Sequence, residues 1–179
     1  MSAQDQDQRP STWFHWHRRL ILPGIQVLDI ACGKGRHAIA AAALGADVVA
    51  LDHDADRLEI ARVRAAQRGL TVTWECADLT TVSLPEKAFD VVMGFNYLDR
   101  NRMEYFKQAL KPGGHFIYET FLESQHVFGW GPSSPERVLK WGELSALVQP
   151  FEVLFAREVV EAFDSRSAAL ASVVAVRRE

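Results

Sequence analysis

The stretch that decides the fold reads Val27-Leu28-Asp29-Ile30-Ala31-Cys32-Gly33-Lys34-Gly35-Arg36. The apolar residues up to Ile30 predict a buried strand, and the alanine-rich segment after Gly35 predicts a helix. Two glycines one residue apart let the backbone approach a ligand closely, because neither carries a Cβ. The helix directs its free N–H groups and the positive end of its dipole into the same space. The stretch therefore predicts a strand, a glycine turn and a helix that bind a nucleotide-like ligand.

Strands and helices alternate around this unit along most of the chain, as in parallel sheets with helices on both faces. The predicted strands span 26–32, 47–51, 71–77, 89–95, 115–121, 151–160 and 168–176. The predicted helices span 35–44, 54–68, 101–110 and 142–148. Because only a short polar turn joins the last two strands, they must pair antiparallel. We expect an α/β fold, a Rossmann-like seven-stranded, mostly parallel sheet with helices on both faces and an antiparallel C-terminal hairpin.

Composition limits the class of protein. The 179 residues carry a net charge of −3, which argues against a nucleic-acid partner. We expect a frayed polar tail over 1–10 and a single domain over 11–179. Cys32 and Cys76 lie in apolar runs without metal-ligand spacing, so we expect reduced core thiols, no metal and a cytoplasmic protein. No secretory h-region and no uncharged apolar run of ~18 residues is found, so we expect no membrane association.

Three acidic residues follow the first three predicted strands. The carboxyl ends of parallel strands line one crevice, so Asp29, Asp52 and Asp78 are expected to converge on one ligand. Asp52 is placed to hold two ribose hydroxyls, and Asp78 to accept a hydrogen bond from an adenine amino group. Asp29 is placed to attract an ammonium or sulfonium group, or to brace the turn as a buried structural carboxylate. An Asx turn is the alternative for Asp78.

A dinucleotide site is the competing interpretation of the glycine turn. Gly33-Lys34-Gly35-Arg36-His37-Ala38 matches the G-x-G-x-x-G/A pattern of nicotinamide and flavin enzymes. Asp29 and two small residues separate strand and turn, however, and the chain has no room for the second half of such an enzyme. Asp78 would also have no function there. A nicotinamide-binding protein therefore stays an alternative.

Five segments occur in the order found in class I S-adenosylmethionine-dependent methyltransferases, which the chain resembles over residues 11–176. They are Asp29-Ile30-Ala31-Cys32-Gly33-Lys34-Gly35, Asp52, Cys76-Ala77-Asp78-Leu79, Phe89-Asp90-Val91-Val92-Met93-Gly94-Phe95-Asn96 and Leu110-Lys111-Pro112-Gly113-Gly114. Within that family, Gly33–His37 and Glu119-Thr120-Phe121 resemble the small bacterial tellurite-resistance-type enzymes. The resemblance implies S-adenosyl-L-methionine as cofactor and transfer of its methyl group to a small-molecule nucleophile.

The cofactor residues that the resemblance implies lie on the first four strands and the turns after them. They are Asp29, Ala31, Gly33, Gly35, Arg36, Asp52, His53, Asp78, Leu79 and Phe95. His37 stands in the first turn of the helix and is interpreted as a packing residue rather than a base. The aromatic segment before the first strand is predicted to pack as a helix on the sheet through Trp13, Trp16, His17 and Leu20.

The catalytic residues are left unassigned, with substrate-side candidates at the ends of the fourth and fifth strands. They are Asn96, Tyr97, Glu119 and Thr120. Family members that methylate planar nitrogens carry [DNS]-P-P-[YF] here, whereas Asn96-Tyr97-Leu98-Asp99 lacks the prolines. The loop Phe128-Gly129-Trp130-Gly131-Pro132 is a candidate substrate lid. An RNA or protein methyltransferase, a cofactor sensor without catalysis, and a homodimer are left open.

Overall fold

The computed structural model describes residues 9–132, 134–163 and 166–179. Most of the tail predicted over 1–10 therefore lies outside the described residues. Within them, none of the helices has the length and apolar character needed to span a membrane.

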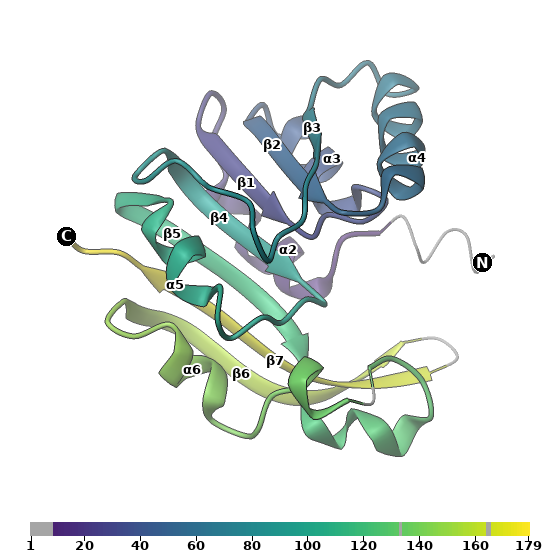
Figure 1. The fold of residues 1–179 in the computed structure, drawn as a ribbon, viewed down its shortest axis with the longest axis vertical. Helices are drawn as coiled ribbons and strands as arrows, with labels where there is room; N and C mark the ends of the chain where they lie inside the picture. The colour runs from purple at the N-terminus through teal and green to yellow at the C-terminus, as the bar shows by residue number, and fades with distance from the viewer. Residues whose placement is uncertain (1–8, 133, 164–165) are drawn as a thin grey trace.

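One twisted seven-stranded sheet forms the centre of the molecule, in the order β3-β2-β1-β4-β5-β7-β6 (Figure 1). Its strands are β1 Gln26–Ile30, β2 Asp47–Asp52, β3 Thr73–Cys76, β4 Phe89–Phe95, β5 Leu110–Phe121, β6 Glu152–Phe163 and β7 Arg166–Val176. The first five strands run parallel, and β7 pairs antiparallel with both β5 and β6. This arrangement confirms the predicted α/β fold and its antiparallel C-terminal hairpin.

Helices cover both faces of this sheet. The α-helices are α2 Thr12–His17, α3 Arg36–Ala43, α4 Ala55–Ala66, α5 Met103–Gln108 and α6 Glu143–Leu147. The 3-10 helices are η1 Arg18–Leu20, η2 Glu123–Phe128 and η3 Pro135–Arg137. One apolar cluster joins the sheet to α5 and α6, and a second joins it to α2, α3 and α4. Both faces of the central sheet are therefore buried, which explains why β1, β2 and β4 are mostly apolar without alternation, whereas the edge strand β3 is largely exposed.

The glycine turn is fixed by the packing between α3, α4 and β3. Gly35 has φ +77°, and a Cβ there would lie 2.5 Å from the Trp74 ring and 2.9 Å from the Ala61 Cβ. Gly33 has φ +56°, but nothing lies within 4 Å of its Cβ position. The two glycines thus serve different purposes: Gly35 lets α3 approach its neighbours, whereas Gly33 faces open space.

Several local predictions differ from the structure. The residues Lys111-Pro112-Gly113-Gly114, which the sequence places between a helix ending at 110 and a strand starting at 115, lie within β5, because a register shift between Phe89 and Val91 accommodates them. Residues 124–140, for which the sequence predicts neither a helix nor a strand, contain most of η2 and all of η3. The packing face predicted for α2 was wrong at Trp16, which is 58% exposed. Phe14 packs into the core beside Trp13 instead. Cys76 is exposed at the end of a short strand, so only Cys32 is a core thiol.

Candidate active site

The glycine loop between β1 and α3 is anchored by Asp52 at the carboxyl end of β2. One carboxylate oxygen of Asp52 accepts a 2.7 Å hydrogen bond from the Gly33 N–H, and the other accepts one of 3.0 Å from Asp54. Asp52 is itself buried. Ala31, at φ +54°, adopts a left-handed conformation that residues with a Cβ rarely take. Such conformations persist only where their surroundings enforce them, and they gather at functional sites.

A cavity of about 430 Å³ opens beside this loop. We call it the loop cavity, and define it by the predicted cofactor residues that line it, which are Ala31, Gly33, Arg36, Asp52, His53 and Phe95. Asn96 and Tyr97 line it as well. The other predicted cofactor residues, Asp29, Gly35, Asp78 and Leu79, do not lie on its surface.

Asp29 lies directly beneath the glycine loop and is buried. It accepts a hydrogen bond from the backbone N–H of Ala38, in the first turn of α3, where helical N–H groups lack intrahelical partners. Its Oδ2 atom has no hydrogen-bond partner among the described residues. Burial raises the pKa of Asp29 to about 8. A mostly neutral carboxyl group in this position fits the bracing role better than attraction of a cation.

Asp78 forms the Asx turn that was named as its alternative. Its Oδ1 atom accepts hydrogen bonds from the Thr80 backbone N–H at 2.9 Å and from the Thr80 hydroxyl at 2.7 Å. These bonds lower the pKa of the exposed Asp78 carboxyl. Leu79, next in sequence, is buried in the core. The three carboxylates thus converge only in part, with Asp52 on the cavity surface, Asp29 beneath it and Asp78 outside it.

His37 connects α2 to the glycine loop. Its ring stacks on Phe95 with centroids 3.7 Å apart, and its Nε2 atom accepts a 3.0 Å hydrogen bond from the Ser11 N–H. Burial lowers the pKa of His37 well below its ordinary value. The imidazole is therefore neutral, and both its stacking and its hydrogen bond agree with a packing role.

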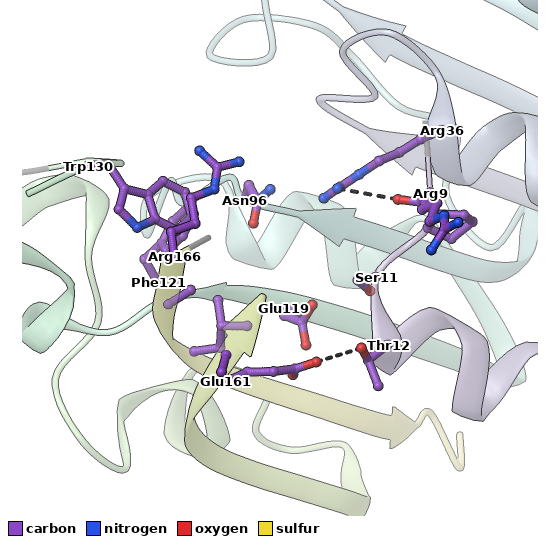
Figure 2. A pocket seen from close by; sticks show the side chains of 14 residues that line it. Arg9, Ser11, Thr12, Arg36, Asn96, Glu119, Phe121, Trp130, Glu161 and Arg166 are labelled. Carbon is purple, nitrogen blue, oxygen red and sulfur yellow. Dashed lines mark hydrogen bonds between the residues drawn. The ribbon is translucent and has the colours of Figure 1, made fainter. Parts of the chain in front are cut away.

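A second cavity, of about 360 Å³, lies between the start of α2 and the ends of β5, β6 and β7 (Figure 2). We call it the hairpin cavity. Glu119, Phe121, Trp130 and Glu161 line it, and Arg36, Asn96 and Arg166 line both cavities. The two cavities therefore adjoin at these three residues.

Asn96 stands where the two cavities meet. Its φ of +59° turns the chain at the end of β4, and its N–H donates a 2.8 Å hydrogen bond to the Glu119 carbonyl. The neighbouring Tyr97 lines the loop cavity, and its carbonyl accepts a 2.8 Å hydrogen bond from the Tyr118 hydroxyl. Burial raises the pKa of Tyr97 to about 12, so its phenol stays protonated near neutral pH.

Glu119 belongs to a buried network that the sequence did not reveal. Its Oε2 atom accepts hydrogen bonds from the Ser172 hydroxyl at 2.7 Å and from Arg157 at 3.1 Å. Arg157 also bonds Glu161 at 2.7 Å, and Glu161 accepts a bond from Thr12. Burial raises the pKa of Glu119 despite the nearby guanidinium. The available signal was the presence of Arg157, Glu161 and Ser172 within strands rich in apolar residues.

Thr120 faces the opposite side of β5 from Glu119. It is fully buried, lies outside both cavities, and its hydroxyl has no partner among the described residues. The structure thus brings Asn96, Tyr97 and Glu119 to the cavities but leaves Thr120 away from them, as strand alternation requires.

About half of the chain matches a known protein family. Residues 27–114 match the family model described as "Methyltransferase domain". The ubiquinone biosynthesis O-methyltransferase of Roseobacter denitrificans is 32% identical over 66% of this chain and 50% of its own length. The protein of the same name from Brucella ovis is 29% identical over 82% of this chain and 60% of its own length. The chain thus spans about half to three-fifths of these curated relatives.

Solved structures show the same fold. TehB from Haemophilus influenzae has a TM-score of 0.74 at 19% identity, covering 90% of this chain and 62% of its own. An S-adenosylmethionine-dependent methyltransferase from Mesorhizobium loti has a TM-score of 0.73 at 22% identity, covering 94% of this chain and 99% of its own. At these identities the likeness concerns the fold alone.

Proposed function

We propose that this chain is a class I S-adenosylmethionine-dependent methyltransferase and that it transfers a methyl group to a small-molecule hydroxyl acceptor. The observation that carries the proposal is the junction of two cavities at Asn96, one beside the glycine loop and one over the hairpin. A methyl donor and an acceptor placed in these cavities would meet at that residue.

The residues of the loop cavity fit S-adenosylmethionine. Its volume of about 430 Å³ lies within the range of small-molecule sites. Space is open at the Gly33 Cβ position, so the backbone there admits a ligand closely. Asp52 would hold the ribose hydroxyls, and Arg36, in the first turn of α3, would attract the carboxylate of the amino-acid moiety. When bound, the cofactor supplies a methyl group already activated on a sulfonium.

The hairpin cavity would hold the acceptor. Its volume of about 360 Å³ favours a small molecule over a protein or nucleic-acid segment. The curated relatives are named as O-methyltransferases, which supports a hydroxyl nucleophile. Glu119 would accept the proton that the hydroxyl releases, because its carboxyl lines this cavity and its raised pKa suits proton uptake. Orientation of the reactants between β4 and β5 would supply much of the remaining acceleration.

The test is the affinity for S-adenosylhomocysteine, measured by calorimetry on the wild-type protein and on Asp52→Asn. We expect the variant to lose at least about tenfold in affinity, since it loses charge-assisted hydrogen bonding to the ribose. Asp56→Asn, an exposed acid in the first turn of α4, is the matched control and should bind normally.

Because Asp52 also bonds Gly33, the stability of Asp52→Asn must be measured by denaturant unfolding alongside binding. A folded variant with undiminished affinity would contradict the assigned site. Failure of the wild-type protein to bind S-adenosylhomocysteine would contradict the proposed function itself.

A further inference from the structure

The hairpin cavity has two ends of different charge. Toward the sheet, Glu119 and Glu161 share the guanidinium of Arg157, so their negative charge is partly compensated. At the mouth lie the arginines at positions 9, 36 and 166 (Figure 2). Since Arg36 is assigned to the cofactor's carboxylate, Arg9 and Arg166 remain for a second ligand, against two glutamates that Arg157 already partly neutralises. The balance of charge favours an anionic ligand in this cavity.

An aromatic wall adjoins the arginine end. The Trp130 indole N–H donates a 2.8 Å hydrogen bond to the Ser167 carbonyl of β7, which fixes the ring against the hairpin. Trp130 meets Phe121 edge-to-face, with ring centroids 5.7 Å apart. The Trp130 carbonyl also accepts a bond from the buried Gln125. Gln125 lies in η2, and its Oε1 atom accepts a 2.8 Å hydrogen bond from the Ala169 N–H of β7. The loop that carries Trp130 is thus attached to the sheet directly through the indole and indirectly through Gln125.

Arg166 combines these two features. Its guanidinium lies over the Trp130 ring, 4.1 Å from the centroid. A guanidinium stacked on an indole through its face keeps its edge N–H groups directed outward, where they can bond a carboxylate in bidentate geometry. Figure 2 shows this side chain beside Trp130 at the side of the cavity nearest Asn96.

We propose that the hairpin cavity binds an aromatic carboxylate, with its ring against Phe121 and Trp130 and its carboxylate paired with Arg166. The inference rests on the proposed function and specifies its acceptor class. A cavity of about 360 Å³ accommodates one ring with short substituents. With the carboxylate at Arg166, the ring extends toward Glu119, which places a ring hydroxyl beside the carboxyl proposed to take its proton.

The experiment measures binding of benzoate, benzamide and acetate by calorimetry and ligand-observed NMR, at saturating S-adenosylhomocysteine. The bound nucleoside fills the loop cavity, so benzoate cannot occupy the position of the cofactor's carboxylate. We expect benzoate to bind about tenfold or more tightly than benzamide, which lacks the charge, and than acetate, which lacks the ring.

Two variants separate the contributions. Arg166→Gln should remove the preference for benzoate over benzamide, and Trp130→Leu should weaken both aromatic probes more than it weakens acetate, because acetate loses only the stacking that orients Arg166. Arg62→Gln, an exposed arginine on α4, is the matched control and should leave all three affinities unchanged.

Equal affinity for benzoate and benzamide in the wild-type protein would overturn the proposal. It would also be overturned if Arg166→Gln weakened only S-adenosylhomocysteine, since Arg166 lines the loop cavity too and would then serve the cofactor. If S-adenosylhomocysteine does not bind at all, the proposed function fails, whereas the comparison of benzoate and benzamide in its absence still tests the anionic site.

Discussion

The two halves of the sheet build their cavities in different ways. Around the loop cavity, the anchoring bond joins Asp52 to Gly33, which lies 19 residues away in the loop that follows the neighbouring strand β1. Around the hairpin cavity, Arg157 bonds Glu119 across 38 residues, and Thr12 bonds Glu161 across 149. The first half therefore depends on local backbone geometry, and the second on side chains that only the completed fold brings together.

The largest expected effect tests the hairpin half. Replacing Arg157 by Leu leaves the buried Glu119 and the partly buried Glu161 without their shared cation. Loss of one partner of a buried ion pair costs about 3–5 kcal/mol, because the remaining charge stays desolvated. We expect a loss of this size in the free energy of unfolding at neutral pH, measured with urea.

The control for Arg157→Leu is Arg178→Leu, which breaks an exposed pair with Glu152. Exposed pairs contribute about 1 kcal/mol or less. If the two substitutions cost the same, the buried network does not stabilise the hairpin half as described.

The next effect tests the loop half through its backbone. A Cβ in Gly35→Ala would meet the Trp74 ring and Ala61, at a residue with φ +77°. Strain in the left-handed region and overpacking together should cost about 2–4 kcal/mol. Gly33→Ala is the matched comparison, since its Cβ would enter open space.

We expect Gly33→Ala to cost only about 1–2 kcal/mol, the strain alone, and to weaken S-adenosylhomocysteine binding because its Cβ projects where the ligand approaches. Chemical denaturation and calorimetry give both quantities. Equal destabilisation by the two alanines would show that packing of α3 against β3 does not determine the turn.

How much the sequence could predict follows the same division. The stretch around Gly33 and the alternation of elements predicted the fold and most of the lining of the loop cavity, because short-range rules govern strands, turns and helix starts. The separate purposes of Gly33 and Gly35 were not predictable, since they depend on Trp74 from a distant strand. Asp78 satisfied the same sequence pattern as Asp52 but uses its carboxylate in a local turn.

The hairpin cavity was predicted less completely. Glu119 was singled out by its position at a strand end, whereas Arg157 and Glu161 were not singled out at all. Arg157 and Glu161 pair with each other within β6, but their further partners lie on other strands and on α2, so no spacing in the sequence marks the network. Thr120 was chosen together with Glu119 because both end the same strand, although alternation places only one of them at the cavity.

The last effect concerns pH and the brace beneath the glycine loop. The Asp29 carboxyl has a pKa raised by burial from its ordinary 3.8 to about 8. Between these values the folded protein retains a proton that the unfolded chain releases, so the contribution of Asp29 to stability falls as pH rises from about 4 to 8. Asp29→Asn removes this dependence and adds a constant cost from an amide without a partner. We therefore expect the stability of the variant relative to wild type to increase over this pH range, by at least about 1.4 kcal/mol, the equivalent of one pKa unit.

Urea unfolding at several pH values measures this change in relative stability, with Asp47→Asn, an exposed acid at the opposite end of β2, as the control for loss of charge. A difference that stays flat with pH would mean that Asp29 is ionised under the loop, and the glycine turn would then rest on a buried anion rather than a neutral brace.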